Sequence, residues 1–370
     1  MSKVLVNESS LTGIADAIRS KNGSTTTYKP SEMAAAITAI SGGGSGPEIP
    51  DSAFVITGDA SHWDYNGKWN DFITAYADRW NTNNINSINA AFENSHIGNI
   101  PFHINLDNYV YMSRAFINCD FSTPPTINGT SVEVRGIISL FYNCKMKNIP
   151  DDYFNFIGSL TNNCSMNNIF YNCTFLRNFP SSANIIPHIG IRTIPSNSFY
   201  SSMCSSCYVL DEITNLGVSP LTYTSNAFVS CVSYCCRLNN FTFESGKTVN
   251  WKNQTIDLST VGYGLYDYLA QPAGITIDKK VTDDSSYQSL KNDIDWYTFK
   301  VDYSRYNHDS AVATINSLPD ASAYIAANGG TNTIKFKGAA GSATDGGAIS
   351  SLTPEEIAVA TAKGWTVTLV

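Results

Sequence analysis

A short phrase that occurs twice is the feature that most constrains how this chain can fold. FYNCKMKNIP begins at Phe141, and FYNCTFLRNFP begins at Phe170. Related phrases place the same phenylalanine at Phe92 and Phe116, so that it returns after 24, 25 and 29 residues. Such a period is typical of a repeat protein, because each unit is too small to bury its own apolar side and must stack on the next.

We therefore expect an α+β fold in which residues 88–250 form an irregular solenoid of short parallel strands. Equivalent residues of successive turns would lie about 4.8 Å apart. Phenylalanine would fill the interior, and cysteine, which is small and apolar, suits a tight bend inside it. Degenerate phrases at 202–213 and 225–243 extend the pattern. The predicted repeat core consists of Phe92, Phe116, Cys119, Phe141, Cys144, Phe170, Cys173, Phe228 and Cys231.

The later cysteines also allow a structural zinc site as an alternative. Cys204 and Cys207 form one two-residue knuckle, and Cys231, Cys235 and Cys236 offer further thiolates. Structural zinc usually takes a tight pair of cysteines from each half of the site, and the second group is irregular. The earlier repeats hold a cysteine with no second one beside it. We therefore expect buried thiols, with no metal and no cofactor.

The first 41 residues predict two short helices, which are too small to form a stable core alone. A Gly/Ser/Pro linker, GGGSGPEIP, follows at 42–50. We expect the helices to dock on a partner rather than on the body of the chain. A poorly ordered arm is the alternative. The predicted docking residues are the apolar positions at helical spacing: Leu11, Ile14, Ile18, Met33, Ile37 and Ile40.

Residues 51–87 are rich in aromatic side chains. The helical spacing of Trp69, Phe72, Tyr76 and Trp80 predicts a helical cap that covers the end of the repeat domain. The alternative is an aromatic surface that stacks on sugars. Its candidate glycan contacts are Trp63, Tyr65 and Trp69.

Residues 251–370 are expected to continue the repeats and then cap them with helices and strands. NHDSAVATINSL predicts a capped helix that His308 caps or braces, and NTIKFKG predicts a strand. In SLTPEEIAVATAKGWTVTLV, Thr353 is the expected N-cap, Pro354 the first helical residue, Glu356 the partner in a capping box and Gly364 the stop. An edge strand over WTVTLV follows.

Composition and motifs exclude several function classes. The net charge is −8, and no cluster of Lys and Arg marks a nucleic-acid surface. The start lacks the apolar region of a signal peptide, and no run of 18 apolar residues occurs, so we expect synthesis in a cytoplasm and no membrane partner. The five histidines stand in no catalytic motif, and we expect no enzyme.

Parts of the chain resemble known families. Ala115-Phe116-x-x-Cys119 and Ala227-Phe228-x-x-Cys231 resemble the core of BspA-like leucine-rich repeats, a bacterial surface-antigen type. LTGIADAIRSKNGSTTTYKPSEMAAAITAI, at 11–40, resembles an N-terminal segment common in tail and baseplate proteins of bacteriophages. The end, HDSAVATINSL and LTPEEIAVATAKGWTVTLV, resembles the C-terminus of phage proteins with such repeats.

These resemblances imply a virion structural protein of the tail, fibre or baseplate, with a leucine-rich-repeat-like solenoid. It would bind other virion proteins through its N-terminal helices and present the solenoid to a host-surface glycan or protein. By analogy with fibre-like parts it would form a homo-oligomer, with a trimer favoured. One alternative is a purely architectural fibre or collar protein. Another is a glycan depolymerase, which would need two facing carboxylates.

Overall fold

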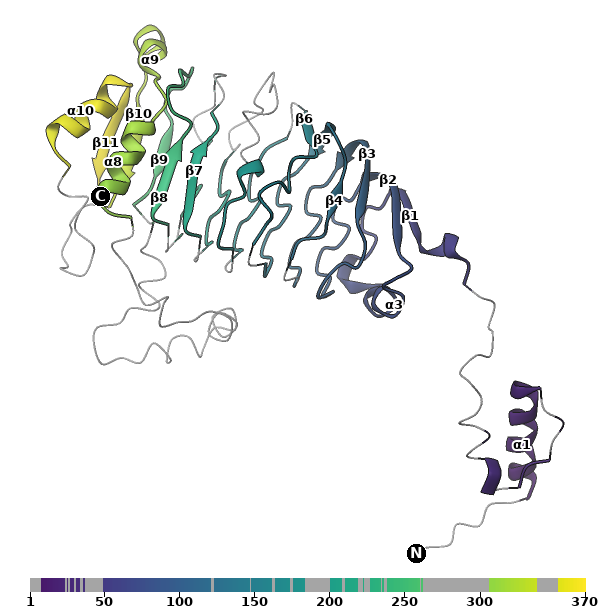
Figure 1. Ribbon diagram of the computed structural model, residues 1–370. Coiled ribbons are helices and arrows are strands. Elements are labelled where there is room, and N and C mark those ends of the chain that lie inside the picture. The colour runs from purple at the N-terminus through teal and green to yellow at the C-terminus, as the bar shows by residue number, and fades with distance from the viewer. Residues whose placement is uncertain are drawn as a thin grey trace, which may run out of the picture. The chain divides into compact units, whose positions relative to one another are not determined.

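The computed structural model divides the chain into two compact units, Met1–Phe54 and Val55–Val370, which are described separately (Figure 1). Within the described residues, no helix has both the length and the apolar character needed to cross a membrane. The structure describes residues 8–23, 25, 27–29, 31–33, 36, 49–120, 123–146, 148–161, 164–173, 176–183, 200–207, 210–218, 222, 227–233, 235, 238–259, 261, 306–337 and 352–370.

The N-terminal unit contains helix α1 (Glu8–Asn22) and a second helical segment that includes residues 31–33 and 36. Their apolar faces form a small cluster of their own, made by Ala15, Ile18, Met33 and Ala36 with Leu11 and Tyr28 at its edge. Ile14 lies outside this cluster and is 44% exposed. Of the predicted docking residues, Leu11, Ile18 and Met33 thus pack inside the unit itself. Ile37 and Ile40 lie outside the described residues.

The first part of the body is an open sheet of parallel strands. Its order is β1-β2-β3-β5-β6, so that each strand pairs with the next one along the chain, and the short β4 pairs beside β3. The strands are β1 (Val55–Asp59), β2 (Asn81–Ser87), β3 (Ile104–Tyr111), β4 (Ile127–Asn128), β5 (Val132–Gly136) and β6 (Ile157–Leu160). Three short 3-10 helices also occur. In chain order, η1 (Asp51–Phe54) precedes β1, η2 (Tyr65–Gly67) lies between β1 and β2, and η3 (Ser181–Ala183) follows β6.

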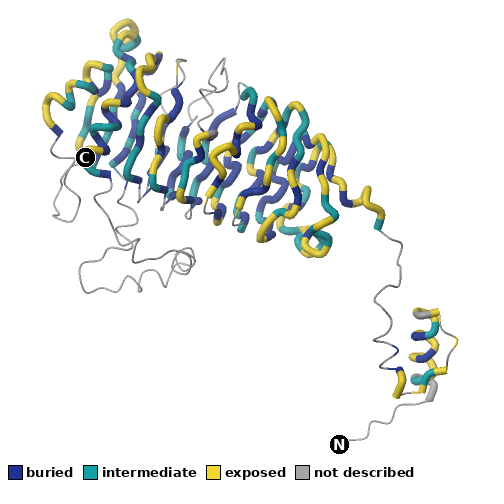
Figure 2. Tube along the Cα trace, in the orientation of Figure 1, coloured by how far each residue is buried: buried dark blue, intermediate teal, exposed yellow. Residues whose placement is uncertain are grey.

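Two smaller parallel sheets follow, and the described part of the body is mixed α/β without a closed barrel. Strand β7 (Glu212–Leu216) pairs with β8 (Asn240–Phe243), and β10 (Asn332–Phe336) lies between β9 (Thr255–Asp257) and β11 (Trp365–Leu369). Parallel pairing requires a long return path for the chain between strands. Figure 2 shows the result, with buried positions recurring in strand after strand along the body.

The expected helical cap over 51–87 is wrong in most of its length. The helix is confined to α3 (Asn70–Ala75), and the chain leaves helical geometry at Tyr76. Strands β1 and β2 occupy the two ends of the segment instead. The aromatic spacing supports little more than one turn, and beyond it the pairing of β2 with β3, which buries Ile85, outweighs helical preference.

The C-terminal helices are confirmed. Helix α10 (Pro354–Ala362) has Thr353 as its N-cap with Glu356 closing the capping box, and Gly364 follows it with a φ of 80°. Helix α8 (His308–Ser317) is capped by Asn307 and Ser310 in the same way. Helix α9 (Ser322–Asn328) was not predicted. The edge strand is β11, at the outside of its sheet.

Helix α8 covers the open edge of strand β8 with three hydroxyl groups. Ser310 Oγ donates to the Asn239 carbonyl (2.5 Å), and Thr314 Oγ1 donates to the Phe241 carbonyl (2.6 Å). Ser317 Oγ accepts from the backbone N–H of Phe243 (3.1 Å). All three hydroxyl residues are buried on one face of the helix. The helix therefore satisfies backbone groups that would otherwise leave an edge open to other chains.

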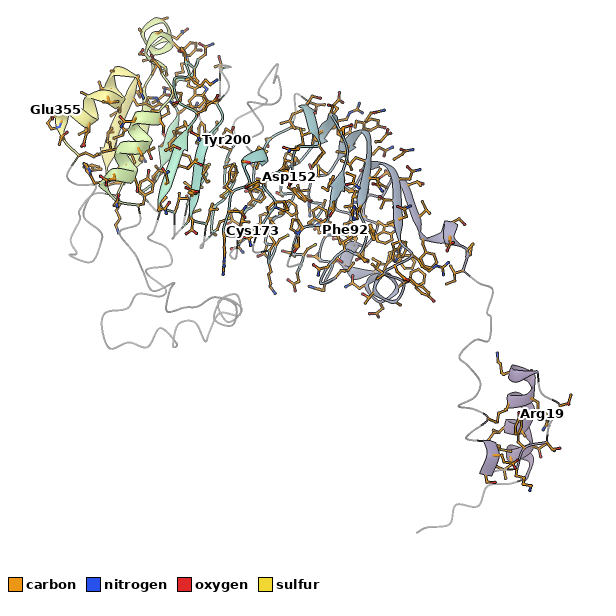
Figure 3. All side chains as sticks on the ribbon, viewed as in Figure 1. Arg19, Phe92, Asp152, Cys173, Tyr200 and Glu355 are labelled. Carbon is orange, nitrogen blue, oxygen red and sulfur yellow. The ribbon has the colours of Figure 1, made fainter. Side chains whose placement is uncertain are left out.

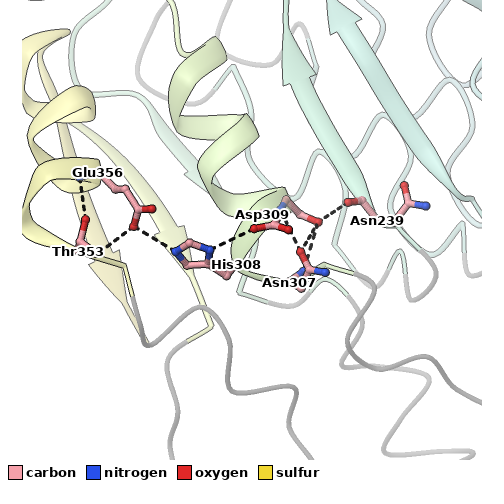
Figure 4. A network of polar contacts seen from close by, with 7 residues as sticks. Asn239, Asn307, His308, Asp309, Thr353 and Glu356 are labelled. Carbon is pink, nitrogen blue, oxygen red and sulfur yellow. Dashed lines mark hydrogen bonds and ion pairs between the residues drawn. The ribbon is translucent and has the colours of Figure 1, made fainter.

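Helices α8 and α10 are joined by His308, as Figure 4 shows. His308 Nε2 lies 3.1 Å from Glu356 Oε2, and its Nδ1 lies 3.3 Å from Asp309 Oδ1. Hydrogen bonds to Asp309 and Glu356 raise the pKa of His308. The Glu356 pKa is lowered, first by the Thr353 backbone N–H and then by His308. His308 thus braces the two helices, beside the N-cap of the first and the capping box of the second.

Candidate functional site

The repeated phrases form rows that run from one turn of the chain to the next. The N–H of Phe92 donates to the Ala115 carbonyl, that of Phe116 to Leu140, and that of Phe141 to Ile169. The same pattern continues from Phe170 and then Cys204. We call the aligned positions the marker row: Phe92, Phe116, Phe141, Phe170, Cys204 and Val232.

The phenylalanines of the marker row stack in the core. Ring centroids lie 5.7 Å apart for Phe92 and Phe116, 5.2 Å for Phe116 and Phe141, and 6.0 Å for Phe141 and Phe170, with interplanar angles of 15°, 13° and 8°. Every one is buried, and Phe92 and Cys173 are labelled among the other side chains in Figure 3. This row is packing, and it offers no surface to a ligand.

A cysteine three residues after a marker residue donates a hydrogen bond to the backbone of the preceding turn. Each Sγ lies close to the carbonyl oxygen of the marker residue one turn earlier. The pairs are Cys119 with Phe92 (2.9 Å), Cys144 with Phe116 (2.5 Å), Cys173 with Phe141 (2.6 Å), Cys207 with Phe170 (3.0 Å) and Cys235 with Cys204 (2.9 Å). We call these five cysteines the thiol row. A thiol that donates here is protonated, which fits the raised pKa that burial gives Cys144 and Cys207.

The predicted alignment of Phe228 and Cys231 is wrong by four residues. Both are buried, but Tyr200 N–H donates to the Ala227 carbonyl and the Tyr200 ring stacks on Phe228 at 5.2 Å. Phe228 therefore aligns with Tyr200 and lies four residues before Val232, the residue of its turn in the marker row. Cys235, not Cys231, belongs to the thiol row. Cys231 and Cys235 lie four residues apart, so that either could be matched to the cysteine of the repeated phrase. Only the backbone pairing shows which of the two is aligned with the other turns.

The zinc alternative gains no geometric support. Across the part of the chain that the structure describes, no three His, Cys, Asp or Glu side chains gather where they could share a metal ion. Burial raises the pKa of Cys204 to about 11 and that of Cys231 further still, which disfavours the thiolate that a metal needs. Cys236 lies outside the described residues.

A ladder of asparagine side chains runs along the same turns. We call it the asparagine row: Asn66, Asn94, Asn118, Asn143 and Asn172. Each Nδ2 donates to the Oδ1 of the preceding member, over distances of 2.9, 2.6, 2.7 and 2.7 Å. All five residues have φ between 56° and 58°. Asparagine tolerates this left-handed conformation better than most residues, so its place here has a backbone cause as well as a side-chain one.

A buried acid, Asp64, lies one turn before the first residue of the marker row. Asp64 N–H donates to the Ala91 carbonyl, which aligns Asp64 with Phe92, and its side chain is fully buried. Its carboxylate accepts from the Trp69 N–H and from Ser95 Oγ, both at 2.5 Å. Burial raises the pKa of Asp64, against the effect of these donors. We assign Asp64 a structural role, because it ties the first turn to Trp69 and α3.

The candidate glycan contacts of the first turn are divided by the structure. Trp63 packs edge-on against Trp80, Phe92 and Phe102, with centroids 5.1, 5.9 and 6.1 Å away, and is therefore part of the core edge. Tyr65 and Trp69 are 38% and 39% exposed. The ammonium of Lys68 lies 4.9 Å from the Trp69 ring centroid. Two of the three predicted residues are thus at the surface.

A second aromatic surface lies on the outward face of β3 and β5. We call it the tyrosine–arginine patch: Tyr109, Tyr111, Glu133 and Arg135. The guanidinium carbon of Arg135 lies 3.9 Å from the Tyr109 ring centroid and 5.9 Å from that of Tyr111. Arg135 Nε donates to Glu133 Oε1 at 2.5 Å. Tyr111 is 44% exposed.

Sequence reasoning missed this patch, although part of its signal is in the sequence. In NYVY and VEVRG, period-two alternation places both tyrosines on one face and Glu133 and Arg135 on one face. The pairing of Tyr109 with Glu133, which brings the two segments together, comes from the register of β3 with β5.

Electrostatics hold the patch in one arrangement. The pKa of Arg135 is raised, chiefly by the hydrogen bond to Glu133. A guanidinium that is stacked on one ring and bonded to a neighbouring carboxylate has little freedom to lose when a ligand arrives. The patch therefore combines an exposed aromatic ring, a fixed donor and a carboxylate on a rigid sheet.

Comparisons with protein-family models, curated proteins and solved structures find no match to this chain.

Proposed function

We propose that this chain is a structural protein of a bacteriophage tail, fibre or baseplate. Its N-terminal helices dock it on the particle, and its body is a leucine-rich-repeat-like solenoid that presents a binding face to the host surface. The observation that carries the proposal is the division of the chain. It consists of a small helical unit, Met1–Phe54, and a separate compact unit of parallel strands, Val55–Val370.

The solenoid part of the proposal is supported by the regular rows. The same backbone hydrogen bond recurs between successive phrases, and the phenylalanines, thiols and asparagines each align with their own kind. Repeats stacked in this way bury a continuous core and expose long regular faces. A repeated face suits adhesion, because many weak contacts to a cell surface add up through multivalency.

The docking part is supported by the N-terminal phrase at 11–40, which resembles the segment found in phage tail and baseplate proteins, and by Ile14. An isoleucine that is 44% exposed on a helix, outside its own unit's cluster, is available for burial against another protein.

The test of docking is incorporation into particles. Deletion of residues 1–41 should abolish it, while the remaining chain stays folded. A sharper variant is Ile14→Asp, which should lower incorporation by roughly tenfold or more, because a carboxylate would be buried in the contact. Ser20→Asp, at an exposed position of the same helix, is the matched control and should be incorporated normally. Full incorporation of the deleted chain would refute the docking role.

The test of presentation is adhesion of residues 51–370, purified alone, to host cells. Saturable binding supports the adhesion role. Incorporation without adhesion would leave an architectural fibre or collar protein, and release of reducing sugars from host polysaccharide would indicate a depolymerase. The mass of the full chain in solution would report whether it assembles as the proposed trimer.

A further inference from the structure

The tyrosine–arginine patch has an exposed aromatic ring beside fixed polar groups. The guanidinium of Arg135 lies closer to the Tyr109 ring (3.9 Å) than to the Tyr111 ring (5.9 Å), and the two rings meet edge-on, with centroids 6.5 Å apart and planes at 84°. Tyr111 is therefore the ring of the patch with the most surface to offer, which agrees with its 44% exposure. Glu133 and Arg135 remain 42% and 35% exposed at their side chains.

The position of the patch in the sheet makes it rigid. Val110 and Val134, which alternate with the patch residues, are fully buried and paired across β3 and β5. The outward side chains are thus carried on strands whose opposite face is packed in the core. Their order in space depends on backbone pairing and on the Arg135 contacts, so no loop has to close before a ligand can bind.

The charges of the patch favour a neutral ligand. Arg135 is already paired with Glu133 at 2.5 Å, so the patch carries no unbalanced positive charge to attract an anion. The chain as a whole has a net charge of −8, which opposes the approach of a polyanion. A carboxylate accepts from hydroxyl groups, and a guanidinium donates to hydroxyl oxygens, so both members of the pair can bind a polyol.

We propose that the tyrosine–arginine patch binds a neutral pyranose of a glycan. The C–H face of the sugar ring packs on Tyr111, and its hydroxyl groups donate to Glu133 and accept from Arg135. This inference rests on the proposed function, which requires a host-surface ligand, and it names both the place and the chemical class of that ligand.

The surface of the first turn is the competing place for such a ligand. Trp63 contributes its ring to the core edge, and Lys68 lies over the Trp69 ring. Tyr65 is exposed, but the ring partner found beside it is His62, edge-on at 5.4 Å, rather than a paired carboxylate and guanidinium. The patch on β3 and β5 therefore offers the fuller set of contacts for a sugar.

The experiment measures binding of the full chain to immobilised neutral oligosaccharides of hexoses and N-acetylhexosamines, beside a matched set that carries carboxylates. We expect binding to members of the neutral set. Tyr111→Ala and Arg135→Ala should each weaken it about tenfold or more, whereas Tyr111→Phe, which keeps the ring, should stay within about threefold. Val229→Ala, at a position 44% exposed, is the control and should bind like the parent chain. Circular dichroism of each variant verifies folding.

Four outcomes overturn the inference. They are unchanged binding by a folded Tyr111→Ala variant, loss of binding in Tyr65→Ala instead, binding confined to the carboxylate-bearing set, and no binding to either set. Incorporation of the chain into particles and adhesion to cells are measured separately. If those persist while Tyr111→Ala has no effect, the proposed function stands and the ligand site lies elsewhere. If the parent chain neither enters particles nor adheres, the proposed function itself fails.

Discussion

Each residue of the asparagine row meets two requirements at one position. The backbone adopts a left-handed conformation while its N–H donates to the next turn, and the side chain continues a ladder between turns. Glycine meets only the first requirement. Residues other than asparagine that can bond along the row pay more for a positive φ. The recurrence of asparagine at this point therefore follows from geometry.

Two substitutions of Asn143 test the backbone requirement and the side-chain requirement separately. Asn143→Ala removes the bonds to Asn118 and Asn172 and also replaces asparagine, which tolerates a φ of 57°, with a residue that adopts this conformation less readily. We expect it to lower the free energy of unfolding by about 2 kcal/mol. Asn143→Gly should cost less, because it keeps the backbone conformation accessible. Urea denaturation measures both, and an equal or larger loss for glycine would show that backbone strain is not the cause.

The thiol row gives a second prediction. Cys144→Ala removes a buried sulfur and its bond to the Phe116 carbonyl, and should lower the free energy of unfolding by about 1–2 kcal/mol without changing adhesion. Cys144→Ser keeps a hydrogen-bond donor and should therefore lose less stability. Ser95, three residues after Phe92, is a hydroxyl donor at the corresponding position of an earlier turn. A serine variant less stable than the alanine variant would show that packing, rather than the hydrogen bond, explains the cysteine.

At the scale of elements, the close approach of neighbouring turns limits the size of the side chains that a strand can have. A β-carbon built on Gly158, in β6, would lie 2.5 Å from the backbone of Ser131. Gly158→Ala should therefore cost about 3 kcal/mol by forcing β5 and β6 apart. Gly98→Ala, where nothing lies within 4 Å, is the matched control and should change stability by less than about 0.5 kcal/mol. Thermal unfolding that is equal for the two variants would contradict this packing.

The contact between α8 and α10 should depend on pH. The pKa of His308 is raised above 6.5 by Asp309 and Glu356, so its contribution is complete below about pH 6.5 and is lost as the pH rises through the folded-state pKa. The pKa of Glu356 is lowered below 4.5, so its contribution is present above about pH 4.5 and is lost as the pH falls. The contact is strongest between these limits.

This prediction is measured as the unfolding midpoint across pH 5 to 9. The parent chain should lose more stability between about pH 6 and 8 than His308→Gln, which keeps a polar side chain but does not titrate. Parallel profiles for the two proteins would mean that His308 contributes no pH-dependent stability.

Secondary structure was predictable where local signals act alone and was missed where pairing decides. Helix α10 was predicted to the residue because Thr353, Pro354, Glu356 and Gly364 each signal a boundary. Strands β1 and β2 were missed, because their partners lie more than 20 residues away in the chain. Phe228 was misaligned for the same reason.

At the scale of the whole molecule, the division into two units predicts independent folding. Residues 55–370 alone should keep the circular dichroism and the unfolding midpoint of the same region in the full chain, because the contacts of each unit are largely internal. Comparison of the two proteins by thermal denaturation tests this. Aggregation or a large loss of stability in the fragment would show that the N-terminal unit is needed for the fold.

The candidate site was only partly accessible from sequence. The density of tryptophan in residues 51–87 indicated a glycan surface there, but Trp63 packs edge-on against Trp80. The tyrosine–arginine patch lies on two segments that become neighbours only through the register of β3 with β5. Alternation indicates which face a side chain takes, yet it does not indicate which strand lies beside it.

The turn rows also give the body an electrical polarity. In ordinary strands the peptide dipoles alternate and largely cancel. Here the N–H groups of His62, Asp64 and Asn66 all point to the following turn, where the carbonyls of residues 89, 91 and 93 point back to them, and later turns repeat this sense. The dipoles therefore add along the stack, as they do along an α-helix. The negative pole lies toward the turn of Asn66 and the positive pole toward that of Val232.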